Sequence, residues 1–70
     1  MTKDNRKLLR IGEVSKLTTI SKSHIYTLIR QGKFLKPIKL SIQTSAWVES
    51  EVLEWIEQRI ALRDQTMGVA

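Results

Sequence analysis

With 70 residues and no cysteine, the chain has the size of one small domain, and its composition excludes disulfides and thiolate metal sites. Its single histidine excludes a histidine-rich metal cluster. A formal net charge of +5, from 12 Lys and Arg against 7 Asp and Glu, favours an anionic partner. The apolar fraction of 41% is sufficient for one modest core.

The charges are divided unevenly along the chain. Residues 1–44 carry ten Lys and Arg against two acids, a net of +8, whereas residues 45–70 carry two against five, a net of −3. This asymmetry predicts that nucleic acid binds to one face only. Because no apolar stretch has the length of a signal peptide or a membrane span, we expect a soluble cytoplasmic protein that does not contact membranes.

The first elements that the pattern indicates are a basic arm and a short helix. Residues 1–8 form the arm, which we expect to be flexible. Apolar residues then recur at Ile11, Val14 and Leu17, which is the helical spacing i, i+3, i+6. We expect this helix to end at the Thr18–Thr19 step.

A second helix follows at the spacing of a helix-turn-helix. Ser21 is a suitable N-cap because its hydroxyl can accept an orphan backbone N–H. Gly32 is placed to end the helix in the left-handed conformation. The buried stripe of this helix is Ile25, Leu28 and Ile29. The opposite face is polar and free of acids, and it holds Ser23, Thr27 and Arg30, with His24, Tyr26 and Gln31 at its edges.

Beyond Phe34 the pattern changes to that of a β-hairpin. Ile38–Leu40 alternate apolar and charged residues directly after a proline, which is an allowed start for an edge strand. The polar step Ser41–Thr44 follows, and Ser45–Trp47 return toward the core. We therefore predict a small hairpin whose tip is Ser41–Thr44.

The last predicted element is an amphipathic helix that runs to about Arg63. Glutamates occupy most of its polar side, which we expect to face solvent. Both Trp47 and Trp55 are expected in the core, because so small a domain needs its aromatic residues for burial. The apolar face of the helix is Val48, Val52, Trp55, Ile56 and Ile60.

The sequence contains no constellation that supports catalysis. Ser23 and His24 are neighbours, but they project about 100° apart on a helix, and no acid lies nearby to orient a histidine base. The three glycines are isolated, so no phosphate-binding loop is formed. We predict no enzymatic activity, no catalytic residue, no metal site and no cofactor.

The second helix is the candidate recognition element, because an α-helix fits the major groove of B-DNA. We expect the lysines around the hairpin to follow the phosphate backbone, with the hairpin tip at the adjacent groove. The alternatives are an ordinary solvated helix face, lysines that protect an edge strand from aggregation, and a Tyr26 that packs at the core edge. The predicted DNA-binding residues are Lys22, Ser23, His24, Tyr26, Thr27, Arg30, Lys33, Lys36, Lys39, Gln43 and Thr44.

Four stretches are distinctive in combination, namely Leu8–Val14, Ser21–Ile29, Gly32–Leu40 and Trp47–Ile56. Together they resemble the AlpA family of small prophage-type transcriptional regulators, related in fold to phage excisionases and the MerR DNA-binding domain. The resemblance implies a DNA-binding winged helix-turn-helix, and family members act as activators, repressors or recombination directionality factors. This chain has Thr27 where the family commonly has an arginine, and it has Ser41 and Gln43 where the wing commonly has a glycine and a nearby arginine. Backbone contacts in the wing are therefore expected to fall on Lys36 and Lys39.

We predict a mainly α winged helix-turn-helix of the MerR or excisionase type, with three helices and a short two-stranded β-hairpin as the wing. The domain is expected over residues 9–63, with a flexible tail over residues 64–70. The predicted function is sequence-specific binding of double-stranded DNA as a transcriptional regulator of a prophage or integrative element. The alternatives are an excisionase-type factor that bends DNA and, in another class, a protein-interaction adaptor that uses the Glu-rich last helix. Weak cooperative self-association on DNA, and contact with an integrase or RNA polymerase, are further partner hypotheses.

Overall fold

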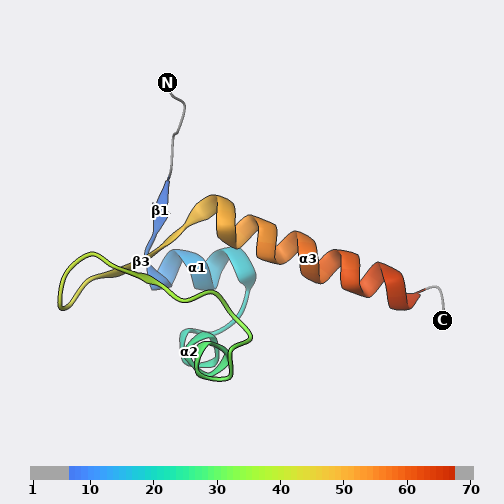
Figure 1. The fold of residues 1–70 in the computed structure, drawn as a ribbon, viewed down its shortest axis with the longest axis horizontal. Helices are drawn as coiled ribbons and strands as arrows, with labels where there is room; N and C mark the ends of the chain where they lie inside the picture. The colour runs from blue at the N-terminus through green and yellow to red at the C-terminus, as the bar shows by residue number, and fades with distance from the viewer. Residues whose placement is uncertain (1–6, 68–70) are drawn as a thin grey trace.

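The computed structural model describes residues 7–67, so most of the predicted arm (residues 1–6) and the end of the predicted tail (residues 68–70) lie outside the described residues. Three helices and a small antiparallel sheet make up the fold, which confirms a mainly α winged helix-turn-helix (Figure 1). In chain order the elements are β1 (Leu8–Leu9), α1 (Ile11–Thr18), α2 (Lys22–Arg30), β2 (Ile38–Lys39), β3 (Ser45–Val48) and α3 (Glu49–Met67).

Helix α1 is bounded by local hydrogen bonds at both ends. At its start, the Arg10 backbone N–H donates to Glu13 Oε1 at 2.9 Å, so the carboxylate lies in the first turn where the helix dipole favours it. The helix ends at Thr18, as the Thr18–Thr19 step predicted, and Thr19 adopts the left-handed conformation with φ 65°. The Ser15 hydroxyl then donates to the Ile20 carbonyl at 2.6 Å and fixes the turn toward α2.

The caps that the sequence predicts for α2 are confirmed. Ser21 Oγ accepts the His24 backbone N–H at 3.3 Å. After the helix, Gly32 has φ 74°, and two further bonds run back into the last turn. They join Lys33 N–H to the Leu28 carbonyl at 2.8 Å and Gly32 N–H to the Ile29 carbonyl at 3.0 Å. This is the Schellman pattern, which satisfies carbonyls that the helix end would otherwise leave without donors.

The hairpin is also confirmed, but the sheet has a third strand. Strands β2 and β3 are antiparallel, with Ile38 opposite Ala46. On the other edge of β3, β1 pairs in the register Leu8 opposite Val48 and Leu9 opposite Trp47, giving the order β1-β3-β2. The assignment of Leu8 to a flexible arm was therefore wrong, because the backbone pairs with β3 and the adjacent Leu9 side chain is buried in the core.

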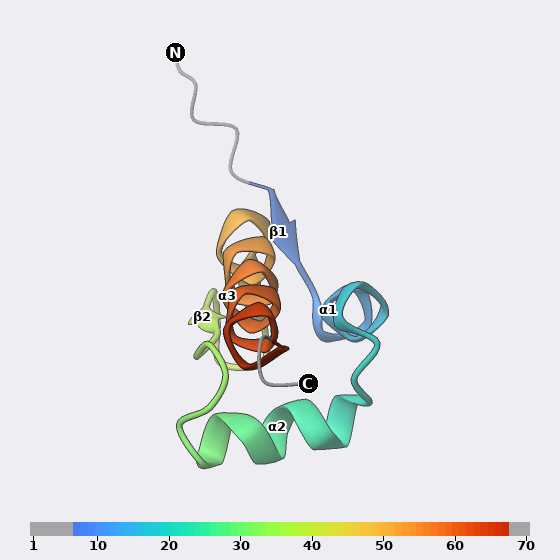
Figure 2. The same cartoon turned by 90° about the vertical axis from the view of Figure 1, so that its right-hand side faces the viewer.

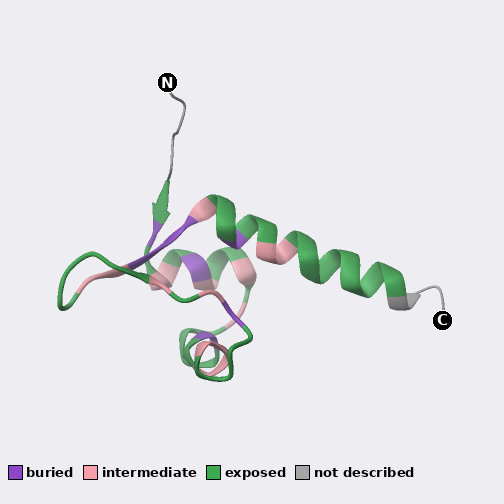
Figure 3. Cartoon of the chain, in the orientation of Figure 1, coloured by how far each residue is buried: buried purple, intermediate pink, exposed green. Residues whose placement is uncertain are grey.

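A single core lies where α1, α2, the sheet and the first turn of α3 meet (Figure 3). Trp47 is buried at its centre, and its indole Nε1–H donates to the Leu35 carbonyl at 3.0 Å. The indole therefore satisfies its one polar atom without leaving the core. The buried residues of the cluster are Leu9, Val14, Ile25, Phe34, Trp47 and Val52.

Two expectations for the last helix were wrong. Val48 belongs to β3 and not to the helix, because its backbone is held in the ladder opposite Leu8. The helix continues to Met67 instead of ending near Arg63, and its C-terminal half extends past the core (Figures 1 and 3). Ile60 is accordingly 38% exposed, although it lies on the apolar face that Val52 begins.

Candidate nucleic-acid interface

Along the outer face of α2, a row of hydrogen bonds joins the side chains of Arg30 and Thr27 to the backbone carbonyl of Ser23. Thr27 Oγ1 donates to the Ser23 carbonyl at 3.1 Å, and Arg30 Nη2 donates to Thr27 Oγ1 at 3.3 Å. The structure thus brings together the three residues that the sequence placed opposite the buried stripe. Arg30 uses one of its five guanidinium donors within the row and keeps the others for a ligand.

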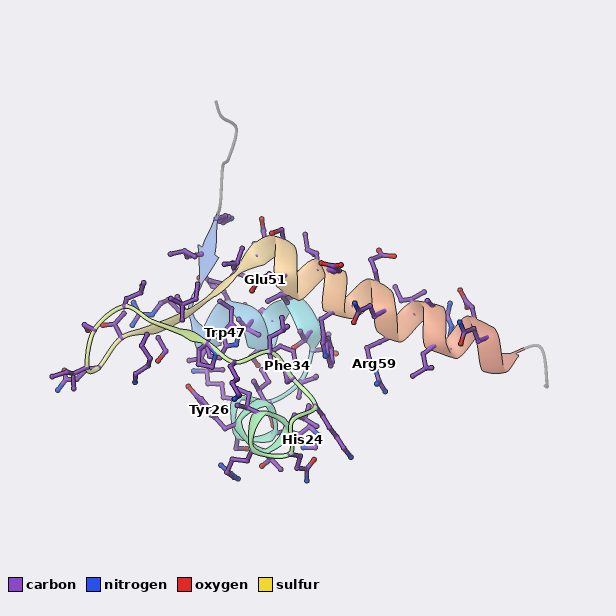
Figure 4. The ribbon with its side chains drawn as sticks, in the orientation of Figure 1. His24, Tyr26, Phe34, Trp47, Glu51 and Arg59 are labelled. Atoms are coloured by element: carbon purple, nitrogen blue, oxygen red, sulfur yellow. The ribbon has the colours of Figure 1, made fainter. Side chains whose placement is uncertain are left out.

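Tyr26 and His24 lie on opposite flanks of α2 (Figure 4). Tyr26 is 42% exposed and lies on the side of the β2–β3 hairpin. His24 lies on the side of α3, where it lines a groove between α2 and α3. Because consecutive helical residues project about 100° apart, Ser23 does not share this flank with His24.

This groove has a volume of about 500 Å³ and combines an apolar floor with basic residues. Leu28 and Trp55 contribute to the floor, while His24, Lys33 and Arg59 are exposed lining residues. Figure 2 looks along α3 and shows α2 crossing below it, so the groove borders α2 itself.

Arg59 is a candidate contact that the sequence analysis missed. Its Cζ lies 5.8 Å from the centroid of the Trp55 ring, and the side chain extends from α3 toward the side of α2 (Figure 4). The sequence did contain a sign of this residue, because Arg59 follows Val52 and Trp55 on one helix face. The change from apolar to cationic residues along that face marks the end of the core.

The wing is the β2–β3 hairpin with its connecting loop, residues 38–48, and it extends away from the helices (Figure 1). Lys39 Nζ donates to the Ile42 carbonyl at 3.4 Å, which places this cation beside the tip. Gln43 is exposed, whereas Thr44 is half-buried and its backbone closes the turn by accepting Leu40 N–H at 2.8 Å. Ile42, which the sequence analysis did not single out, is 92% exposed.

The remaining predicted residues lie at the margins of these surfaces. Lys22 begins α2 beside α1, where a Cβ built on Gly12 would lie 3.9 Å from Lys22 Cε. Lys33 follows the end of α2, its side chain is exposed, and its carbonyl accepts the Trp55 indole N–H at 3.2 Å. Lys36 is exposed just before β2.

The charge distribution separates this side of the molecule from the outer side of α3. The segment from Val14 to Val48, which contains α2 and the wing, has six Lys and Arg and no acidic residue. The exposed acids of α3 are Glu51, Glu54, Glu57 and Asp64. Of the basic residues on the same helix, Arg63 is paired with Asp64 at 2.8 Å.

Within residues 7–67 there is no group of three or more His, Cys, Asp or Glu side chains that could hold a metal ion. In the same part of the chain, no helix combines the length and the hydropathy that a bilayer crossing requires.

The comparison with protein families decides the relationship of the chain. A family model described as prophage CP4-57 regulatory protein (AlpA) matches residues 7–60. The chain belongs to the AlpA family. The matched segment contains β1, the two helices of the helix-turn-helix, the wing and the part of α3 that packs on the core. This membership confirms the resemblance that the four sequence stretches indicated, and it identifies a family of prophage regulatory proteins.

A curated relative is the uncharacterized protein ORF88 of enterobacteria phage P4, which is 44% identical over 57 residues. The match covers 81% of this chain and 65% of the relative, so this AlpA-family chain spans about two thirds of that protein's length. No solved structure matches the chain.

Proposed function

We propose that this AlpA-family protein binds duplex DNA in a sequence-specific manner and regulates transcription in a prophage or integrative element. The observation that carries the proposal is the acid-free surface on which α2 presents Ser23, Thr27 and Arg30 beside the wing. A helix with an exposed polar face and a neighbouring wing fits the major groove and the flanking backbone of one DNA site.

In this arrangement Arg30 reads a base edge, because a guanidinium can donate two parallel hydrogen bonds to guanine. Thr27 holds Arg30 through its hydroxyl and contributes less as an independent reader, since that hydroxyl already donates to the Ser23 carbonyl. Tyr26 and His24 lie on opposite flanks of the helix, and in the proposed complex each faces one of the two DNA strands that border the major groove.

The backbone contacts come from exposed cations around α2. Their charges attract phosphates without regard to sequence, and they fix the register in which α2 meets the bases. The proposed phosphate contacts are Lys22, Lys33, Lys36, Lys39 and Arg59. In the wing, Gln43 contacts the adjacent groove, while Thr44 acts through the shape of the turn.

Selection of bound fragments from random duplex DNA tests this function. The parent protein should enrich one motif, and Arg30→Ala should change the preferred base at one position with a loss of about 1–3 kcal/mol there. Lys36→Ala is the matched control, because losing a phosphate contact should weaken all duplexes alike and leave the motif unchanged. If Arg30→Ala selects the same motif as the parent, Arg30 is not a base reader.

The salt dependence of binding provides a second test. Five phosphate contacts predict a log–log slope of about −4.5, at about −0.9 per phosphate on B-DNA. A slope near −1 on the selected duplex would contradict a broad basic interface. In fragments of the host genome, bound sites at promoters would favour transcriptional control, whereas bound sites at an attachment locus would favour excision. Contacts with an integrase or RNA polymerase, and self-association on DNA, stay predictions.

A further inference from the structure

The wing of this protein ends in an apolar side chain. Exposure rises along the outgoing strand and loop, from 41% at Ile38 to 52% at Leu40 and 92% at Ile42. An isoleucine in this position gains nothing from the fold, because almost all of its surface remains in water. Folding therefore does not explain an isoleucine at the tip, and a contact with another molecule is the alternative.

The turn holds Ile42 in a defined place. Thr44 N–H donates to the Ser41 carbonyl at 3.3 Å, which makes Ile42 and Gln43 the two corner residues of a β-turn. Leu40 N–H and Ser41 N–H both donate to the Thr44 carbonyl, at 2.8 Å and 3.3 Å, and close the loop behind the corner. The apolar side chain is thus carried on a hydrogen-bonded support.

Polar and cationic neighbours at the tip match the chemistry of a nucleic-acid groove. Lys39 Nζ donates to the Ile42 carbonyl at 3.4 Å, so a positive charge lies at the backbone of the tip residue. Gln43 is exposed directly after it, and no acid occurs in the wing before Glu49. Proteins that bend DNA combine an amide or cation that contacts the minor groove with an aliphatic residue that enters between base steps.

We propose that Ile42 is a wedge that enters the minor groove beside the α2 site, partly unstacks one base step and bends the duplex toward the major groove. This inference rests on the proposed function, because α2 must hold the domain on a duplex. The wing contains no arginine, so its positive charge comes from Lys39. In this proposal Ile42 adds the unstacking of a base step to that electrostatic contact.

The test measures DNA bending by energy transfer between dyes at the two ends of a duplex of about 30 base pairs, selected from random sequence by the parent protein. The parent should bend this duplex by an angle within about 20–90°. Ile42→Ser should remove most of the bend, and Ile42→Leu should retain it. Leu40→Ser is the matched control, because it makes the same change in polarity on the same hairpin but behind the tip.

A second readout locates the wedge. A 2-aminopurine placed at successive steps should brighten at one step next to the α2 site with the parent, and should not brighten with Ile42→Ser. Since the cost of unstacking is offset by the additional protein surface that a bent duplex touches, we expect Kd to change by less than about tenfold. Ile42 is almost fully exposed, so the substitution should leave the fold unchanged by circular dichroism.

Equal bending by the parent and Ile42→Ser would overturn the inference, and so would a parent that binds the selected duplex without bending it. Sedimentation of the parent and of Ile42→Ser without DNA tests whether the tip instead contacts a second copy of the protein. If the parent self-associates, Ile42→Ser is monomeric and the bend is unchanged, the tip is an interface between copies and not a wedge. A parent that binds no duplex would overturn the proposed function and this inference with it.

Discussion

Removing the Trp55 side chain tests how α3 is attached to the recognition unit. The Trp55 ring contacts Phe34 edge-on, with centroids 4.7 Å apart and an interplanar angle of 71°. Its indole N–H donates to the Lys33 carbonyl at 3.2 Å, directly after the end of α2. Trp55 is partly buried, in contrast to Trp47, because it lies where α3 begins to leave the core.

The expected cost of Trp55→Ala follows from these contacts. Burial of most of a tryptophan side chain, roughly 150 Å², contributes about 4 kcal/mol. The edge-on pair adds about 0.5–1 kcal/mol, and the partly exposed indole hydrogen bond about 0.5 kcal/mol. We therefore expect a loss of about 5 kcal/mol, at the upper end of the range for truncating a large aromatic side chain. In a domain of this size that is most of the stability.

Urea unfolding followed by far-ultraviolet circular dichroism measures this loss. Trp55→Phe keeps a ring against Phe34 but lacks the indole donor, so it should remain folded and cost only about 1 kcal/mol. Leu53→Ala is the matched control on the same helix, because Leu53 is 44% exposed and should change stability by less than about 0.5 kcal/mol. If Trp55→Ala unfolds within about 0.5 kcal/mol of the parent, α3 is not attached through this residue and the reasoning fails.

Three further predictions concern charge and backbone conformation. Arg59→Gln should reduce the magnitude of the salt slope by about 1 and leave the selected motif unchanged. The control Glu57→Gln should not weaken binding. If the slope of Arg59→Gln equals that of the parent, Arg59 does not contact a phosphate. Gly32→Ala should destabilise the protein by about 1–2 kcal/mol, because φ is 74° although the space around it is open. Gly12→Ala should instead stabilise α1 by about 0.5–1 kcal/mol, since its Cβ would meet only Lys22 Cε at 3.9 Å. Urea unfolding separates these two, and shifts of the same sign would contradict the backbone argument.

The helix-turn-helix could be predicted from sequence because its determinants are local. Ser21 caps α2 through a bond to a residue three positions later, and Gly32 ends the helix with its own φ angle. The buried position of Ile25 follows from its place in a helical stripe. None of these features depends on a distant part of the chain, so they can be identified without knowing the fold.

The errors arose where partners distant in sequence decide the structure. Leu8 pairs with Val48, and a strand of two residues has no periodicity that could reveal it. The same pairing takes Val48 out of the helix, although its spacing to Val52 fits a helical stripe. Ile60 continues that stripe but is exposed. Helical periodicity shows which face of the helix is apolar, but it does not show how far along the helix the core extends.

The sequence predicted which residues belong to the proposed interface better than it predicted how those residues are arranged and bonded. Helical spacing placed Arg30 and Thr27 on one face, but it did not show that Thr27 is bonded to both Arg30 and Ser23. Arg59 is distant in sequence from the recognition helix, and only the position of α3 brings it to the same groove. Contacts supplied by separate elements depend on packing, which a residue pattern does not contain.

The use of the aromatic residues bears on which nucleic acid the domain can bind. The chain has four of them, and Phe34 and Trp47 are buried while Trp55 lies edge-on against Phe34. Binding of single strands depends on exposed rings on which successive bases stack, and within residues 7–67 Tyr26 is the one ring left exposed on the side of α2 and the wing. A duplex requires no such platform, because it presents its base edges in the grooves and its phosphates outside. A small domain that uses its rings for the core and its cations for the surface is therefore suited to duplex DNA, and in the proposed complex the aliphatic Ile42 is the group that reaches between stacked bases.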